Sequence, residues 1–395
     1  MAATEQDPPR SASTSRTRGL AVLLVTTFLA LSNFAGLLAV VPLWAAAGGH
    51  GSAGVGATTG VMMAATVATQ LAAPWVFRAL SLRAMMIVGA ALLGAPAPLY
   101  LLSSDAAVIL LLTVVRGIGF ALVVVAGATL IADVATPGKL GRAASYYGVA
   151  AALPNVIALA GGVWAADAWG FSVVFVVSGA AALLGAILAW MLPGGSRGAF
   201  HAASRRDLLG VAPALVLFVT TSAVFGAVST FLPLAGPATP VAALALLAAA
   251  TAIVLGRLAA GPIADRIGAG RLLVPSAAAV ALGTCIAAVA LEGPGWVLVV
   301  GAALIGTGFG AAQNDSFVVT LHVFGPARSG TASTIWNVAF DGGVGVGAFG
   351  LGWVIGQLGY GGAFTGMAIA IAAVAVVLLI LARWLPTTAE VSEQH

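Results

Sequence analysis

Three ionisable residues, Arg116, Asp315 and Asp341, lie inside long apolar stretches of this 395-residue chain. An ionised side chain at the centre of a bilayer costs about 2.5 to 3.5 kcal/mol, so it normally faces a cavity or a partner. Burial favours the protonated form of a carboxyl group and a nearby cation favours the ionised form, so a group between these limits can load and release a proton. The three residues are therefore candidates for proton coupling, with Asp341 first and Asp315 second. Each could instead fix the packing of neighbouring helices.

Uncharged polar residues accompany these groups. Asn337 lies four residues before Asp341 and would share its face of a helix, while two amides directly precede Asp315. We expect a substrate cavity to be lined by Asn33, Arg116, Gln313, Asn314 and Asn337. These side chains, and Gln70 in an earlier stretch, could equally tie helices together.

The composition is that of an integral membrane protein. Apolar residues make up 61% of the chain, charged residues make up 7%, and the mean hydropathy is +1.09, against roughly 45 to 50% apolar and about 25% charged residues in soluble domains. Apolar stretches long enough to cross a bilayer occur at about 19–46, 53–77, 84–102, 106–132, 143–166, 171–192, 207–235, 239–260, 270–291, 295–323, 328–357 and 361–385. Because hydrocarbon cannot hydrogen-bond the backbone, each stretch should be a helix. We predict an all-α integral membrane protein with twelve transmembrane helices.

The basic residues indicate how the chain crosses the membrane. Fifteen of the sixteen Lys and Arg residues fall in the N-terminal tail or on alternate loops, and the sixteenth is Arg116. The opposite loops carry His50, Asp105, Asp167 and Glu292. By the positive-inside rule, both termini are cytoplasmic in a plasma (inner) membrane. This topology explains the sequence pI of about 9.8, and no nucleic-acid partner is expected.

The ends of the chain and its cysteine content argue against a cleaved signal peptide, a disulfide within the chain and a metal site built from cysteines. We expect residues 1–18 and 386–395, which are polar, to be disordered cytoplasmic tails. The apolar run that starts at Gly19 exceeds the roughly 7 to 15 residues of a signal-peptide core, so it should remain as the first helix. The single cysteine, Cys285, supports no disulfide within the chain and no multi-cysteine metal site. With no phosphate-binding G-x-x-x-x-G-K-[ST] motif either, we expect no cofactor, no metal and an energy source in a gradient.

The two halves of the chain resemble each other. A shift of 189 residues superposes Gly117 on Gly306, Phe120 on Phe309, Pro137 on Pro326, Trp164 on Trp353, and Phe175 on Phe364. We therefore predict two six-helix bundles, residues 19–192 and 207–385, joined by a cytoplasmic linker at 193–206. Repeats of this kind place a substrate site at their interface near the midplane, and rocking of the two halves opens that site to each side in turn.

Three segments resemble motifs of the major facilitator superfamily of transporters. The segment from Gly256 to Arg271 resembles the G-x-x-x-D-R-x-G-R signature, and it lies between the eighth and ninth predicted helices. The segment from Arg116 to Ala121 resembles the R-x-x-G-x-G-type segment, shortened by one residue. The glycine-rich segment 337–347 resembles those of sugar and drug efflux members. The resemblance implies a fold of two pseudo-symmetric six-helix bundles, similar to the drug-proton antiporters.

The same resemblance implies a conformational latch in the signature loop. Its residues would be Gly256, Asp265, Arg266, Gly268 and Arg271. The acid would accept hydrogen bonds at the N-terminus of a neighbouring helix and hold the cytoplasmic side closed. The copy in the first half departs from the signature, because Phe77 stands in place of the acid and Leu80 in place of the glycine. The alternative is a solvated loop whose charges only set the topology.

These features predict a transporter and not an enzyme. We expect proton-coupled efflux, by antiport and alternating access, of a small hydrophobic or amphipathic compound. Proton symport or uniport for uptake uses the same parts and is the alternative, and a transport-inactive scaffold or sensor is a more remote one. The expected partners are the small-molecule substrate, protons and membrane lipid, and the protein is expected to be a monomer.

Overall fold

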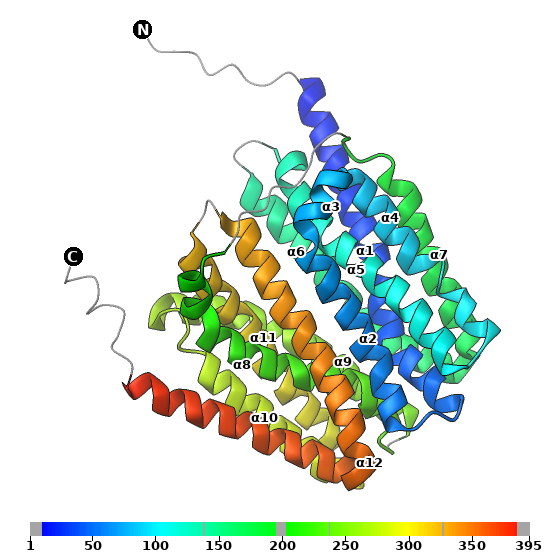
Figure 1. Ribbon diagram of the computed structural model, residues 1–395, viewed down its shortest axis with the longest axis vertical. Helices are drawn as coiled ribbons and strands as arrows, with labels where there is room; N and C mark the ends of the chain where they lie inside the picture. Colours follow the sequence, from blue (N-terminus) through cyan, green and yellow to red (C-terminus); the bar gives the residue numbers. More distant parts are fainter. Residues whose placement is uncertain (1–9, 137–138, 195–202, 237, 326–327, 385–395) are drawn as a thin grey trace.

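The computed structural model describes residues 10–136, 139–194, 203–236, 238–325 and 328–384, and the secondary structure of these residues is helical throughout (Figure 1). The first helices are α1 (Arg10–Ala47), α2 (Ser52–Leu71), α3 (Ala73–Ala79), α4 (Leu82–Gly94), η1 (Pro98–Leu102), α5 (Ala106–Val134), α6 (Leu140–Trp169) and α7 (Phe171–Ala189). They are followed by α8 (Arg205–Phe231), η2 (Leu232–Leu234), α9 (Thr239–Ile267), α10 (Leu273–Ala290), α11 (Gly295–Phe324) and α12 (Ser329–Trp384).

The helices account for every predicted membrane span. In the described part of the chain, ten helical segments are long and apolar enough to cross a membrane, and the pair α2 and α3, bent by 66°, adds one more. The segment Ser329–Ile380 holds two of the predicted stretches, because α12 changes direction at Gly359. The φ of Gly359 is +68°, a conformation that glycine adopts at little cost. The prediction of an all-α protein with twelve transmembrane helices is confirmed.

The bend between α2 and α3 has a local cause. Pro74 lies in the first turn of α3, and its nitrogen carries no hydrogen to donate to the carbonyl of Gln70. Loss of that helical hydrogen bond permits a sharp change of direction one turn after Gln70. The bend therefore lies directly beside the only amide side chain of α2.

One expectation about the chain ends needs correction. Helix α1 begins at Arg10, so residues 10–18, which we expected to be part of a disordered tail, are helical. Ser, Thr and Arg can adopt a helical conformation. Because adding residues to an existing helix is easier than starting one, the helix of the apolar span continues toward the N-terminus through these residues. The remaining tail residues, 1–9 and 386–395, lie outside the described part of the chain, as does most of the predicted linker at 193–206.

The helices form two groups. In Figure 1, α1 to α7 lie on one side of the molecule and α8 to α12 lie on the other. Within the first group α1 packs against α6 and α7, and within the second α11 packs against α9 and α10. The groups meet where α2 contacts α12 and where α6 contacts α9. These two contacts are equivalent under the sequence repeat.

The turns between helices define two ends of the molecule. The end that we call the basic end carries Arg78, Arg83, Arg142, Arg266, Arg271 and Arg328. The other end, which we call the acidic end, carries Asp105, Asp167 and Glu292. Helix α2 runs from the acidic end toward the basic end, and the first part of α12 runs in the reverse direction.

Glycine allows α2 and α12 to approach closely near the acidic end. A Cβ atom on Gly352 would lie 2.5 Å from the carbonyl oxygen of Ser52, and one on Gly56 would lie 2.5 Å from the carbonyl oxygen of Ala348. Separations this short are not found between real Cβ and oxygen atoms, so both positions require glycine while the helices stay in contact. Small residues have this role at helix interfaces in membranes, where van der Waals packing replaces the hydrophobic effect as the driving force.

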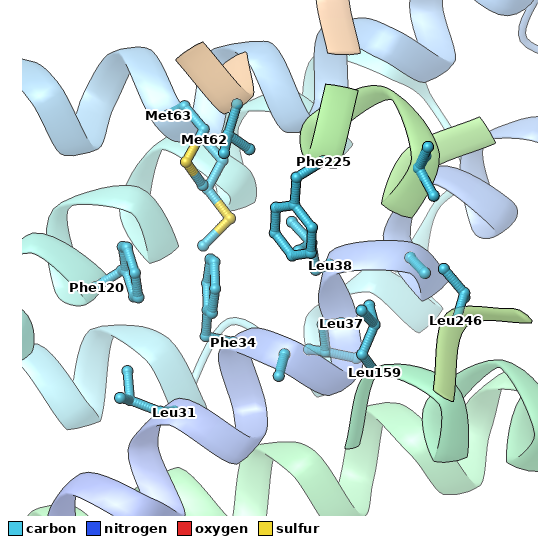
Figure 2. Close-up of a cluster of buried hydrophobic side chains, with 14 of the residues drawn as sticks. Leu31, Phe34, Leu37, Leu38, Met62, Met63, Phe120, Leu159, Phe225 and Leu246 are labelled. Carbon is cyan, nitrogen blue, oxygen red and sulfur yellow. The ribbon is translucent and has the colours of Figure 1, made fainter. Parts of the chain in front are cut away.

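Apolar side chains fill the region between the groups. Figure 2 shows Phe34 and Leu38 of α1, Met62 of α2 and Phe225 of α8 converging there. Phe34 also stacks on Phe120, with ring centroids 3.9 Å apart. The second group has its own aromatic cluster, formed by Phe218, Phe225, Phe309, Trp336 and Phe340.

Replacing Gly352 with Ala should destabilise the contact between α2 and α12. The added methyl group has no space, and overpacking costs about 1 to 3 kcal/mol. The melting temperature of the purified protein in detergent should fall. Gly350, two residues earlier on the same helix, has no atom within 4 Å of its Cβ position, so Gly350→Ala is the matched control and should leave the melting temperature unchanged or raise it. Equal effects of the two substitutions would contradict the close contact.

Candidate functional site

Asp341 lies at the contact between the two helix groups. Its carboxyl group is 1% exposed, and its Oδ2 atom accepts a hydrogen bond of 2.7 Å from Nε2 of Gln70. Asp341 belongs to α12 and Gln70 to α2, so this hydrogen bond connects the two groups. Helical spacing places Asp341 about 18 Å from the first residue of α12, well inside the apolar stretch.

The hydrogen-bonding capacity of this pair is only half used. Oδ1 of Asp341 and Oε1 of Gln70 are both buried and have no hydrogen-bond partner in the described part of the chain. Among these residues, Asp341 forms no ion pair either, because the ion pair recorded there joins Arg328 and Asp207. A buried carboxylate without a cation is unfavourable, so the arrangement favours a carboxyl group that carries a proton.

Asn337, the other candidate on α12, forms a hydrogen bond within its own helix. Nδ2 of Asn337 donates a hydrogen bond of 2.8 Å to the carbonyl oxygen of Ser333, one turn earlier. Asn337 is partly exposed and shares the side of α12 that carries Asp341, as predicted from the spacing. It is not hydrogen-bonded to Asp341.

Arg116 is held inside the first helix group. Its side chain is 1% exposed, and one terminal nitrogen donates to Oδ1 of Asn33 at 3.2 Å and to the backbone carbonyl of Asn33 at 3.5 Å. The guanidinium carbon lies 5.9 Å from the ring centre of Tyr100. Asn33 in turn donates to the carbonyl oxygen of Ser178 at 2.9 Å. The arginine therefore finds carbonyl and amide oxygens, and these contacts link α1, α5 and α7.

One nitrogen of the Arg116 side chain has no hydrogen-bond partner in the described residues, and a small cavity lies beside the side chain. Its Nε is buried without a hydrogen-bond partner among the described residues. A small cavity beside it, lined by Thr58, Thr59, Thr113 and apolar side chains of α1, has room for about one water molecule.

Asp315 anchors the turn that carries the signature motif. Its carboxyl group is fully buried, Oδ1 accepts from the backbone N–H of Gly270 at 2.8 Å, and Oδ2 accepts from the N–H of Leu272 at 2.8 Å. These amides lie in the turn just before α10, where no helical carbonyl accepts from them, and the carboxyl group of Asp315 satisfies both. Asp315 thus ties α11 to the turn between α9 and α10.

The first half of the chain caps the equivalent turn in another way. When Arg78 and Arg83 are aligned with Arg266 and Arg271, Ala84 corresponds to Leu272. The N–H of Ala84 donates to Oγ of Ser81 at 3.2 Å, within the turn itself. A local serine cap in the first half therefore replaces the distant carboxyl group of the second half.

The charged members of the predicted latch point to solvent. Asp265, Arg266 and Arg271 are exposed, and no hydrogen bond or ion pair is recorded for the Asp265 side chain among the described residues. Gly268 has a φ of +99°, so the turn needs glycine there. Gly256 packs against the backbone of Thr307, with no room for a Cβ atom. The latch therefore remains a prediction for a conformation in which the basic end is closed.

The candidate residues thus fall into three places instead of one. Asp341 and Asn337 lie on α12, Arg116 and Asn33 lie together in the first group, and Asp315 lies at the signature turn. Its neighbour Gln313 is buried in α11 and Asn314 is partly buried, and Nδ2 of Asn314 has no hydrogen-bond partner in the described part of the chain.

Two features of the site were not assigned from the sequence. Gln70 was considered only as a general polar residue, and its pairing with Asp341 depends on tertiary contact. The ion pair of Arg328 with Asp207, at 2.6 Å, was also missed. Part of the signal was present there, because Ser204 and Asp207 form a capping box at the start of α8, a pattern readable from the spacing.

Two side-chain hydrogen bonds join the helix groups near the acidic end. The hydroxyl groups of Thr59 and Thr230 are 2.9 Å apart, and Thr239 donates to Oδ1 of Asp167 at 3.2 Å. The hydrogen bond of Gln70 with Asp341 lies nearer the basic end than either of these two. The two groups are therefore joined at the acidic end.

Comparison with known proteins identifies the family. The model of the Major Facilitator Superfamily matches residues 23–239 and again residues 236–394. The chain therefore belongs to the Major Facilitator Superfamily, a family of membrane transporters. A search of curated proteins gives no match.

Solved structures share the fold. A POT family transporter in complex with a thioalcohol-conjugated peptide is 12% identical, with 93% of this chain and 96% of that chain covered at a TM-score of 0.77. A POT family transporter in complex with 5-aminolevulinic acid is 13% identical, with 92% and 96% covered at a TM-score of 0.75. The peptide transporter POT in complex with sulfate is 13% identical, with 93% and 94% covered at a TM-score of 0.75. At these identities the likeness establishes the fold alone.

Replacing Asp315 with Ala should release the signature turn. Two partly buried amides lose their acceptor, and an unsatisfied donor costs at most about 1 to 3 kcal/mol when it is fully buried. Hydrogen–deuterium exchange at residues 268–273 should become faster, as measured by mass spectrometry. Asp265→Asn is the control, because Asp265 is an exposed acid at the end of α9, directly before the turn, and its replacement should leave exchange unchanged. Unchanged exchange in Asp315→Ala would show that the carboxyl group does not hold the turn.

Proposed function

We propose that the protein is a proton-coupled secondary transporter that exports a small hydrophobic or amphipathic compound in exchange for protons. The observation that carries this proposal is the buried carboxyl group of Asp341, which forms its hydrogen bond across the two helix groups and has no cation partner in the described part of the chain. A proton-driven carrier needs a group whose proton affinity depends on conformation. Asp341 meets this requirement because separating α2 from α12 would expose it to a different environment.

The charges at the two ends of the molecule indicate which end faces the cytoplasm. The basic end would face the cytoplasm of a plasma (inner) membrane, in keeping with the positive-inside rule. Because the groups are joined at the acidic end, the described conformation would be the one that opens inward. Asp341 would then give up its proton to the cytoplasm from this state.

The remaining polar candidates take supporting roles in this scheme. Asp315 would position the signature turn and would not carry the proton, since both of its oxygens already accept hydrogen bonds from the backbone. Asp265 would act as the latch when the basic end closes. Arg116 would connect α1 with α5 and present positive charge to the interior.

The lining of the interface supports an amphipathic substrate. Phe34, Met62 and Phe225 lie where the groups meet (Figure 2), and apolar and aromatic groups bind hydrophobic ligands with few polar contacts. The polar groups nearby are few, which disfavours a sugar with many hydroxyl groups. The glycine-rich first part of α12, which resembles efflux members of the family, supports export.

Uptake by proton symport is the second candidate. The solved structures with the same fold include transporters in complex with a peptide and with 5-aminolevulinic acid, and substrates with a carboxylate would suit the uncompensated charge of Arg116. Export and uptake predict opposite movement of substrate for one direction of proton flow. Vesicles of purified protein with an imposed pH gradient, tested with amphipathic dyes and with small peptides, would separate the two. Absence of any proton-linked flux across both panels would favour a scaffold or sensor.

Replacing Asp341 with Asn should uncouple transport from the proton gradient. Asn preserves the shape and the hydrogen bond from Gln70 but cannot release a proton, so accumulation against a concentration gradient should fall by about tenfold or more. Exchange of substrate between equal concentrations should persist. Both rates are measured in vesicles with and without a pH gradient.

Asp315→Asn and Asp265→Asn serve as comparisons for this experiment. Both should change rates more than the steady-state accumulation, because neither removes the coupling proton. If Asp341→Asn and Asp315→Asn both accumulate substrate at the full rate, the coupling role of these acids is wrong.

A further inference from the structure

Gln70 makes the one hydrogen bond found for the Asp341 side chain in the described part of the chain, and the groups that this bond leaves unpaired have a chemical consequence. The pair contributes three acceptor sites and one donor group: two carboxyl oxygens, the amide oxygen and the amide NH₂. One hydrogen bond is made, at 2.7 Å, while Oδ1 of Asp341 and Oε1 of Gln70 remain unpaired and buried. The two unpaired atoms are both acceptors, so they cannot bond to each other while the acid is ionised.

A single proton resolves both deficits. Placed on Oδ1 of Asp341, it would supply a donor that Oε1 of Gln70 can accept. A carboxylic acid and a primary amide can form a closed ring of two hydrogen bonds, in which each group both donates and accepts. Loss of the proton leaves two buried oxygens without a donor, which weakens the contact.

We infer that Gln70 is a coupling residue. Its hydrogen bonding to Asp341, across the two helix groups, depends on whether Asp341 carries a proton, so that the proton itself holds α2 against α12. The inference rests on the proposed proton coupling through Asp341 and names the partner through which the proton acts on conformation. Gln70 was not among the residues assigned to coupling from the sequence.

No other titratable group competes for this role among the described residues. Helix α2 carries no ionisable side chain. The helices packed on α12 carry Arg205, Arg206 and Asp207 on α8, Cys285 on α10, and Asp315 and His322 on α11. Asp207 pairs with Arg328, and Asp315 accepts from backbone amides. Cys285 and His322 are exposed, as are Arg205 and Arg206. Arg116, on the far side of α2, is directed to Asn33.

The position of the pair makes this contact decisive for conformation. Toward the acidic end, α2 and α12 are already in close contact at Gly56 and Gly352. Toward the basic end, α2 bends by 66° within one turn of Gln70. The pair therefore lies where the contact between the helix groups ends, and a hydrogen bond made or lost there changes how far the contact extends. Protonation should favour the state in which the acidic end is closed, and deprotonation should favour its opening.

The test measures conformation without any substrate. In a Cys285→Ser background, cysteines are introduced at the exposed positions Ala144 on α6 and Ala259 on α9, both in the half near the basic end, and are spin-labelled. Electron spin resonance gives the distribution of label distances between about pH 5 and pH 9, a range that brackets titration of a buried carboxyl group. In the otherwise unchanged protein, the ratio of long to short distances should fall by about fivefold or more as the pH rises.

Two substitutions separate the proton effect from simple packing. Gln70→Leu should make the ratio independent of pH to within about twofold, because the proton then has no partner in the other helix group. Asp341→Asn should hold the distribution of the low-pH state at every pH, since two primary amides can form the same reciprocal ring. Gln70→Glu, which can also share a proton with Asp341, should retain pH dependence and keeps the test valid if the leucine variant folds poorly.

Thr59→Val is the matched control on the same helix. It removes the hydrogen bond with Thr230 between the groups, which does not depend on a proton. The ratio should shift by a similar factor at all pH values while its pH dependence remains. Full pH dependence in folded Gln70→Leu, or a high-pH distribution in Asp341→Asn, would overturn the inference. Absence of proton-driven transport by the unchanged protein, with these distance changes intact, would instead refute the proposed function, while the proton-dependent contact of Gln70 with Asp341 would still hold.

Discussion

A polar group buried among apolar helices must find its hydrogen-bond partners inside the protein, because the hydrocarbon around it offers none. In this protein a few side chains meet that constraint, and each does so by joining helices that are distant in the sequence. Asp315 joins α11 to the turn before α10, Arg116 joins α5 to α1, and Gln70 joins α2 to Asp341 of α12. The first two sets are largely satisfied and act as fixed connections. The third is only half satisfied, and that difference separates the part of the structure that can switch from the parts that hold it together.

The constraint also explains how much could be read from the sequence. The twelve spans followed from composition, since a run of apolar residues in a membrane has little choice but to be helical. The repeat followed from a shared register of Pro, Trp and Phe. The family followed from the motif around Asp265, and the family model confirms it over both halves. Even the burial of Arg116 against oxygen atoms was foreseeable, because a cation at that depth has few other partners.

The site was less predictable for a physical reason. A sequence shows which polar residues lie in apolar stretches but not which helix faces which, and the pairing of Gln70 with Asp341 spans 271 positions. Asp315 illustrates the same limit. Its type and depth are equally consistent with a proton carrier and with a capping group, and only the position of the Gly270 and Leu272 amides distinguishes them. The start of α1 at Arg10 shows the opposite case, in which a polar segment becomes helical because the apolar helix after it extends into it.

The different caps of the two equivalent turns have a consequence for how the protein is made. Membrane helices enter the bilayer in sequence as the chain is synthesised. The turn before α4 carries its own cap in Ser81 and can reach its final form as soon as that helix is in place. The turn before α10 must wait for Asp315, which arrives only with α11. The signature turn of the second half therefore lacks its carboxylate acceptor until α10 and α11 have both been made.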